Sequence, residues 1–154
     1  MSIRLSADEA WDVLEHSHTG ILTTLRRDGS PVSLPVWFVV RDRTVCFMTY
    51  EPTRKVARIT NDPRASFLVE SGERWADLRA VHLSGRIEHI DDEGEAAAVD
   101  AALDAKYAAY RTPEEEMPES AKRTYSVRQL FYRLVPDDRI LSWDNARLRP
   151  PVSS

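Results

Sequence analysis

The sequence contains a single cysteine and no long hydrophobic run, and each shortage excludes a class of protein. Cys46 is alone among 154 residues, which excludes an intrachain disulfide or a cysteine-based zinc site. The longest apolar stretch, near Leu34–Val40, is far shorter than the roughly 20 residues that a membrane-spanning helix needs. The first residues lack the apolar core of a signal peptide, so we expect a cytoplasmic protein with no membrane partner.

Positive charge and familiar catalytic motifs are also scarce. With 21 basic and 25 acidic residues the net charge is −4, which disfavours nonspecific binding to nucleic acid. The chain lacks G-x-G-x-x-G, P-loop and G-x-S-x-G motifs, so a Rossmann or P-loop nucleotide site and an α/β-hydrolase nucleophile have no support. Its four histidines are not joined by further ligands at metal-binding spacing, so no metal site is expected.

The composition suits one globular domain. Apolar residues make up 42% of the chain and charged residues 30%, enough for a core and for solubility. The length is that of one domain, so we expect residues 1–154 to fold as a unit, with an exposed loop at 112–122 and a tail at 148–154.

Local signals predict mainly strands joined by turns. Ser6 and Glu9 form a capping-box pair that predicts a helix over 7–17, and Asp28-Gly29 predicts a tight β-hairpin. Pro35 indicates an edge strand or an irregularity, and Gly85 a bulge. Further strands are expected at 32–40, 45–49, 65–70, 80–90, 127–135 and 139–143, and further helices at 53–61 and 92–111. This order predicts an α+β fold, mainly β, or a closed barrel, rather than a doubly wound sheet.

A strand-to-helix junction at residues 47–55 has the parts of an anion site. Thr49 lies at the strand end, and Thr53 can cap a helix that begins with the adjacent cations Arg54 and Lys55. Free amides at a helix start, together with cations, bind phosphate well. The alternative is that Thr53 only caps the helix and the cations are solvated.

A second candidate is an apolar platform over residues 33–37. Pro35 interrupts the backbone ladder beside Val36 and Trp37, and such a surface can receive a tricyclic ring while free backbone groups meet its polar edge. The alternative is that Trp37 is a core aromatic residue. Trp75 has the same ambiguity.

Several motifs in one order resemble the pyridoxamine 5′-phosphate oxidase-like split β-barrels, and more narrowly the flavin/deazaflavin oxidoreductases of that family. The resemblance covers about residues 5–148. It is carried by residues 20–25, 28–31, 35–38, Thr49, 53–55, 61–64, 72–79 and 142–144.

The resemblance implies a split β-barrel with flanking helices, similar to FMN-binding proteins. It further implies a homodimer with a cofactor in a groove between the subunits. The cofactor phosphate would lie at Thr49, Thr53, Arg54 and Lys55. The implied ring-side residues are Ser33, Pro35, Val36, Trp37, Trp75 and Ala80.

The family resemblance also bears on which cofactor is bound. Flavin-binding oxidases of this family use a strand arginine for the phosphate at about the position of Leu34, and its absence disfavours FMN. The deazaflavin coenzyme F(420) adds an oligoglutamyl tail that suits Arg54, Lys55 and Arg58. The leading hypothesis is therefore an F(420)-dependent oxidoreductase that reduces an unsaturated or aromatic small molecule by hydride transfer.

Two alternatives remain open. The chain could be an FMN-dependent oxidase or reductase, or a binding protein for F(420), a flavin or haem that performs no reaction. No catalytic residue is assigned, because solvent can protonate the product; Tyr50, His82 and Trp75 are the candidates if a protein acid is needed. Tetrapyrroles, quinones, unsaturated lactones and nitroaromatics all remain open as substrates.

Overall fold

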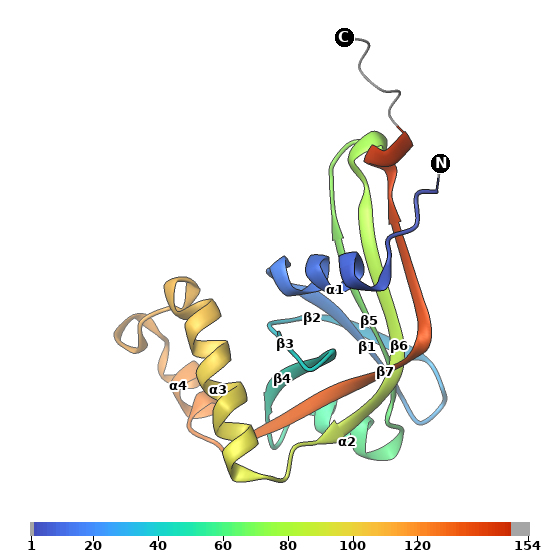
Figure 1. Ribbon diagram of the computed structural model, residues 1–154. Helices are drawn as coiled ribbons and strands as arrows, with labels where there is room; N and C mark the ends of the chain where they lie inside the picture. Colours follow the sequence, from blue (N-terminus) through green and yellow to red (C-terminus); the bar gives the residue numbers. More distant parts are fainter. Residues whose placement is uncertain (1, 149–154) are drawn as a thin grey trace.

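A computed structural model describes residues 2–148, and its centre is one antiparallel sheet of seven strands (Figure 1). The strand order is β2-β1-β5-β6-β7-β4-β3, so β2 and β3, which are consecutive in the chain, form the two opposite edges. The strands are β1 (Gly20–Leu25), β2 (Pro31–Val36), β3 (Val39–Arg41), β4 (Thr44–Tyr50), β5 (Arg64–Ser71), β6 (Arg79–His89) and β7 (Gln129–Asp144). The curled sheet with its unpaired edges is the expected split β-barrel.

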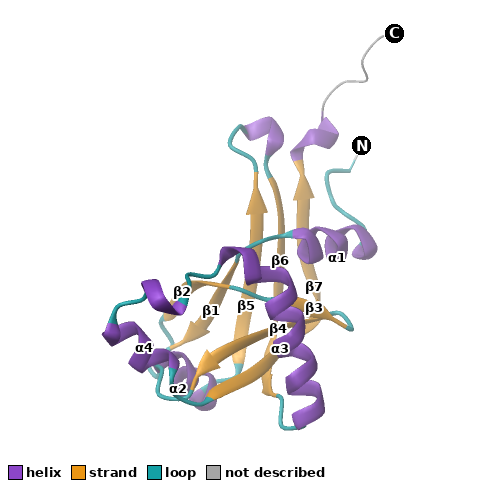
Figure 2. Cartoon of the chain, turned by 90° about the vertical axis from the view of Figure 1, so that its left-hand side faces the viewer, coloured by secondary structure: helices purple, strands orange, loops and turns teal. Residues whose placement is uncertain are grey.

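Helices flank this sheet (Figure 2). The α-helices are α1 (Ala7–His16), α2 (Arg54–Asn61), α3 (Glu93–Tyr107) and α4 (Glu119–Tyr125), and the 3₁₀ turns are η1 (Trp75–Asp77), η2 (Ala108–Tyr110), η3 (Glu114–Glu116) and η4 (Asn145–Leu148). One apolar cluster fills the inside of the curled sheet and includes Trp11 and Leu14 of α1. A second cluster lies between α3 and the strands β3 and β4, and it includes Cys46 with the helix residues Val99 and Leu103.

Several local expectations are confirmed. Ser6 and Glu9 form both bonds of a capping box at the start of α1. Pro35 lies in the edge strand β2, where its missing N–H costs no ladder bond. The register of β6 against β7 shifts between Leu83 and Gly85, and a Cβ at Gly85 would meet the Val135 carbonyl oxygen at 2.1 Å, so this bulge requires glycine.

The hairpin expected at Asp28-Gly29 is present between β1 and β2, but its turn is wider than predicted. Between β1 and β2 only Gly29 has a positive φ, and Arg26 N–H donates to the Ser30 carbonyl, so the loop is wider than a two-residue turn. The tight turn lies instead between β3 and β4, where Asp42 and Arg43 have φ values of 49° and 54°. Positive φ at both central residues is the mark of a type I′ hairpin.

The expected single strand at 32–40 is wrong. The chain leaves the sheet after Val36 and rejoins it at Val39, so Trp37 and Phe38 belong to neither β2 nor β3. The cause is topological: β2 pairs with β1 on one edge, whereas β3 pairs with β4 on the other. Residues 37–38 therefore cross the split of the barrel.

Two expectations for the last third of the chain also need correction. The expected strands at 127–135 and 139–143 are one strand, β7, which bends through Pro136 because that residue pairs with Gly85 at the bulge. The segment 112–122 is largely exposed, but it contains η3 and the start of α4 after Pro118. The chain therefore has four α-helices in its described part, not three.

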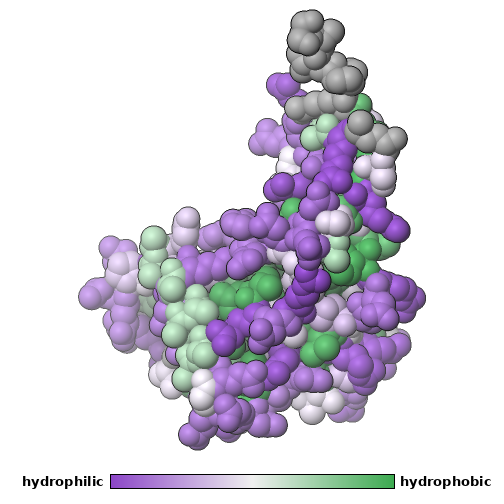
Figure 3. All heavy atoms as spheres, viewed as in Figure 1, coloured by the Kyte–Doolittle hydropathy of each residue, from purple (hydrophilic) through white to green (hydrophobic). Residues whose placement is uncertain are grey.

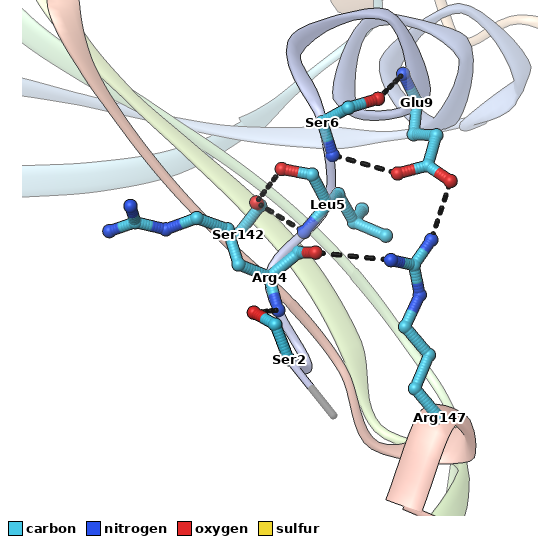
Figure 4. Close-up of polar contacts among 7 residues, drawn as sticks. All are labelled: Ser2, Arg4, Leu5, Ser6, Glu9, Ser142 and Arg147. Carbon is cyan, nitrogen blue, oxygen red and sulfur yellow. Dashed lines mark hydrogen bonds and ion pairs between the residues drawn. The ribbon is translucent and has the colours of Figure 1, made fainter.

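The upper parts of β5, β6 and β7, with η1 and η4, form an arm (residues 69–82 and 140–148) that projects beyond the barrel (Figure 1). The N-terminal segment is bonded along it (Figure 4). Leu5 N–H donates to the Ser142 hydroxyl at 3.1 Å, while the Arg147 guanidinium donates to the Arg4 carbonyl at 3.1 Å and to the Glu9 carboxylate at 2.7 Å. Glu9 thus ties the start of α1 to the arm.

Within residues 2–148, none of the helices combines the length and the apolar character that crossing a membrane requires.

Candidate functional site

The junction between β4 and α2 brings two hydroxyls together. Thr49 is buried at the end of β4, and its Oγ1 lies 3.2 Å from Oγ1 of Thr53, the N-cap residue of α2. The Thr53 side chain makes no capping bond to the helix amides. The backbone N–H groups in the first turn of α2 therefore keep their capacity to donate to a ligand.

The cations of α2 are held in an unfavourable setting. Lys55 is half-buried, and burial, with a smaller contribution from Arg58, lowers the pKa of its ammonium group. Arg58 is directed toward the barrel, where its Nε donates to the buried Thr24 hydroxyl at 2.8 Å. Two like charges therefore lie close together in a partly desolvated place.

The side chains and the helix dipole both make the N-terminus of α2 positive. The first turn of α2 has no acidic residue and begins with Arg54 and Lys55. Positive side chains at the positive end of a helix are destabilising unless an anion neutralises them. This conflict with ordinary helix design is what an anion-binding terminus produces.

Trp37 does not lie in the core. It is 38% exposed, and one face of its indole stacks on the Tyr107 ring, with centroids 4.5 Å apart and an interplanar angle of 4°. His18 meets Tyr107 edge-on at 5.3 Å and Tyr110 at 4.5 Å. These residues form a rigid aromatic shelf that leaves part of the Trp37 side chain open to solvent.

The base of this shelf was missed at the sequence level. Tyr107 is fully buried, and its hydroxyl accepts a bond from Phe38 N–H at 2.9 Å and lies 2.7 Å from the His18 carbonyl oxygen. The Lys106 ammonium donates to the Phe38 carbonyl at 2.9 Å, and burial lowers its pKa to about 8. The sequence places Tyr107 only within the helix expected at 92–111, because nothing local links it to residues about 70 positions earlier.

The other ring-side residues of β2 occupy different surroundings. Ser33 is exposed and bonds the Thr23 hydroxyl at 2.7 Å, and Pro35 is also exposed. Val36 has its side chain in the core, so it can offer a ligand only its backbone. Leu34 is 40% exposed and stands on an open edge strand, where an arginine would be accommodated.

Trp75 and Ala80 do not lie near α2 in a single chain. Thr49 pairs with Leu130 at one end of β7, and Ala80 pairs with Trp143 at the other. The two positions lie 13 residues apart on β7, so at ~3.3 Å per residue up to about 43 Å of bent strand separates them. Trp75 lies still farther along the arm in η1 and is 68% exposed. The expected site residues therefore form two groups, one at α2 and β2 and one on the arm.

The candidate acids are dispersed as well. Tyr50 ends β4, His82 lies in the middle of β6 and Trp75 lies in η1. The His82 Nδ1 atom is buried without a hydrogen-bond partner among the described residues. Nothing in this arrangement selects one of the three as a proton donor.

Across residues 2–148, no cluster of histidine, cysteine and carboxylate side chains could hold a metal ion.

Two open cavities of about 400 and 350 Å³ lie beside α1, and neither is lined by an expected site residue. The first is bounded by the N-terminal segment and the middle of β7, the second by α1 and the β3–β4 turn. On the face of the molecule drawn in Figure 3, hydrophilic side chains cover most of the surface, and hydrophobic ones are exposed in separate small areas.

A protein-family model and several solved structures match this chain. A family model described as pyridoxamine 5′-phosphate oxidase matches residues 6–129, most of the chain. No curated protein matches the sequence.

Solved structures share the fold along nearly the whole chain. A conserved hypothetical protein, Rv2991, from Mycobacterium tuberculosis is 29% identical with a TM-score of 0.80, over 99% of this chain and 93% of its own. An FAD-binding protein from Mycobacterium smegmatis is 25% identical with a TM-score of 0.63, over 90% and 95%. The haem storage protein HutZ from Vibrio cholerae, 13% identical with a TM-score of 0.67 over 93% and 96%, is similar in fold alone.

Proposed function

The chain belongs to the pyridoxamine 5′-phosphate oxidase family, and from this premise we propose that it is an F(420)-dependent oxidoreductase that reduces an unsaturated or aromatic small molecule. The observation that carries the proposal is the start of α2, where Arg54 and Lys55 stand at an uncapped helix terminus without a counter-anion from the chain's own first turn. A phosphate and a polyanionic tail satisfy this terminus.

The residues present fit such a cofactor. Thr49, Thr53 and the first amides of α2 would hold the phosphate, and Lys55 with Arg58 would meet further negative charge. The Trp37 shelf offers an apolar face to the ring. Leu34, in place of a phosphate-binding arginine, favours the deazaflavin over FMN. When bound and reduced, the deazaflavin supplies a hydride to the acceptor.

A second copy of the chain is the proposed partner. The register aligns a row across five strands on the face that points away from the core, and Leu141 in this row is 55% exposed. The row consists of Pro35, Ile21, Leu68, His82 and Leu141. A row that is apolar except for one histidine, on an open sheet face, is typical of an interface. A homodimer through this face would allow the arm of one subunit, with Trp75 and Ala80, to approach the α2 site of the other.

The dimer has a direct test. Replacing Leu141→Glu places a charge in the middle of the proposed interface, so light scattering should show a dimer for the wild-type protein and a monomer for the variant. A monomeric wild-type protein would contradict the interface.

Cys46, the single cysteine, is buried, which agrees with our proposal of a cytoplasmic protein.

The cofactor is tested by titrating purified protein with F(420), FMN and haem while following Trp fluorescence. We expect micromolar or tighter binding of F(420) and weaker binding of FMN. The double variant Arg54→Ala/Lys55→Ala should bind F(420) at least about ten-fold more weakly, about 1.4 kcal/mol.

A matched control removes the same charges elsewhere. Arg27 and Lys122 lie on the β1–β2 turn and on α4, so Arg27→Ala/Lys122→Ala changes the net charge equally and should leave the affinity unchanged. Tighter binding of FMN would assign the protein to the flavin branch. Haem binding without turnover would favour haem storage, the function named for HutZ, a protein of similar fold.

A further inference from the structure

Phe38 stands where the chain crosses the split of the barrel. The strand before it is paired only with β1, and the strand after it only with β4. Trp37 and Phe38 lie between these edges and belong to no strand ladder. Because the Phe38 side chain is fully buried, its peptide groups need partners from another part of the chain.

The C-terminal end of α3 supplies these partners. Tyr107 Oη accepts from Phe38 N–H, and Lys106 Nζ donates to the Phe38 carbonyl, each at 2.9 Å. Lys106 Nζ also lies 3.9 Å from the centroid of the Phe38 ring. The Tyr107 hydroxyl can then direct its own proton to the His18 carbonyl at 2.7 Å. The crossing peptide is therefore bonded on both sides by two consecutive residues of one helix.

Tyr107 also positions Trp37. The Tyr107 ring stacks nearly parallel on one face of the Trp37 indole, with 4.5 Å between the centroids, while Trp37 remains 38% exposed. Tyr107 itself is completely buried and cannot change rotamer without disturbing the α3 cluster. The orientation of Trp37 is thus fixed before any ligand arrives.

We propose that Tyr107 and Lys106 are positioning residues that hold Trp37 and Phe38 out of the sheet and thereby present the free face of Trp37 to the planar ring of a bound ligand. The inference rests on the proposed function for the identity of the ring, but the orientation of Trp37 is a property of the protein alone. Preorganisation of this kind raises affinity because the ordering cost is met during folding.

The test uses three substitutions in full-length protein. Tyr107→Phe removes the hydroxyl and keeps the stack, Tyr107→Leu removes both, and Lys106→Met removes the ammonium group and keeps the stem. Acrylamide quenching assigned to Trp37, by difference from the same protein with Trp37→Phe, should increase in all three and most in Tyr107→Leu. The affinity for F(420) should fall at least about five-fold in Tyr107→Leu and less in the other two.

Matched controls separate positioning from general effects. Tyr132→Phe removes the hydroxyl of a buried tyrosine outside the shelf, whose ring contacts Phe47 and His89, and Lys122→Met removes a lysine charge that pairs with Glu119. Both should leave Trp37 quenching and F(420) affinity unchanged. A purely structural role would lower the melting temperature of the Tyr107 variants, yet leave quenching and affinity unchanged when measured where the variants are folded.

Two results would overturn the inference: unchanged Trp37 quenching in Tyr107→Phe and Lys106→Met, or unchanged ring affinity in variants whose quenching has changed. Failure of the proposed function is distinguishable from both. Wild-type protein that binds neither F(420) nor FMN would refute the ligand part and the proposed function together. The quenching series on ligand-free protein would still decide whether Tyr107 and Lys106 orient Trp37.

Discussion

The two parts of the proposed site are held by opposite means. The α2 terminus is built from residues close together in the chain, is polar, and gathers cations that the helix itself disfavours. The Trp37 shelf is built on a fully buried tyrosine from a helix about 70 residues away. The α2 terminus provides positive charge and lowers the stability of the helix. The Trp37 shelf provides a fixed apolar surface whose base is buried in the core. Substitutions in the two parts should therefore affect stability and binding in different proportions.

The largest effect is expected at the base of the shelf. Tyr107→Ala should lower the free energy of unfolding by about 3–5 kcal/mol, because it empties a large buried volume and leaves Phe38 N–H without its partner. Urea denaturation measures this difference. Tyr110→Ala, an exposed tyrosine three residues later, should change the value by less than about 0.5 kcal/mol. Equal effects at the two positions would refute the distinction.

Salt should weaken the contribution of the α2 terminus to ligand binding but not that of the Trp37 shelf. We expect the affinity for F(420) to fall several-fold between about 0.1 and 1 M salt, where the Debye length drops from about 10 to about 3 Å. Arg54→Ala/Lys55→Ala should flatten this dependence. Trp37→Leu should weaken binding with the dependence unchanged, because it removes apolar contact and no charge. If Trp37→Leu also flattened it, the division between charge and shape would be wrong.

A smaller effect, of opposite sign to that of Tyr107→Ala, is expected for the stability of α2. In ligand-free protein, Arg54→Ala/Lys55→Ala should raise the free energy of unfolding by roughly 0.3–1 kcal/mol, since it removes cations from the positive end of a helix. The same variant loses cofactor affinity, so stability and binding would change in opposite directions. A loss of stability would show that these side chains have a structural role in the fold.

A further prediction concerns the pH dependence of stability. Burial lowers the pKa of Lys106 to about 8 in the folded protein, although Glu15 raises it slightly, so between pH 8 and the ordinary lysine value near 10.4 the unfolded chain binds more protons. Stability should therefore rise with pH through the lower part of this window. Lys55 acts in the same direction. Tyr107 and Tyr132, whose pKa values burial raises, oppose the rise from about pH 10.

Denaturation at pH 7 to 9.5 tests this assignment. Lys106→Met should have a shallower rise than the wild-type protein, because it no longer carries the desolvated ammonium group. The matched variant Lys122→Met should keep the wild-type slope, as Lys122 lies on α4 and pairs with Glu119. Identical slopes in wild type and Lys106→Met would refute the role of Lys106.

Elements defined by neighbouring residues were predictable. The capping box at Ser6 and Glu9, the bulge at Gly85 and the edge position of Pro35 each follow from a single residue type or a fixed spacing. Most of the strands follow from short apolar runs between turn residues. The junction at Thr49 and Thr53 was also predictable, because only residues 50–52 separate the two hydroxyls along the chain.

The errors arose where distant residues decide the backbone. An apolar run at 32–40 cannot reveal that its two halves pair with different partners, β1 and β4. Pro136 suggests a strand end, yet it is accommodated inside β7 because the facing residue, Gly85, has no side chain. In both places a local rule was overridden by a pairing that only the assembled sheet establishes.

The sequence by itself determined the strand-rich architecture, the family and the cationic start of α2, because spacing, turn chemistry and helix polarity act within a few residues of chain. Only the tertiary structure decided that Trp37 leaves the sheet and that Tyr107 and Lys106 hold the crossing. It also decided that Trp75 and Ala80 lie on the arm, at the opposite end of β7 from the residues that pair with the end of β4. The physical reason is that a peptide group which loses its ladder partner takes whichever donor or acceptor the packed fold brings near, and that neighbour is set by topology.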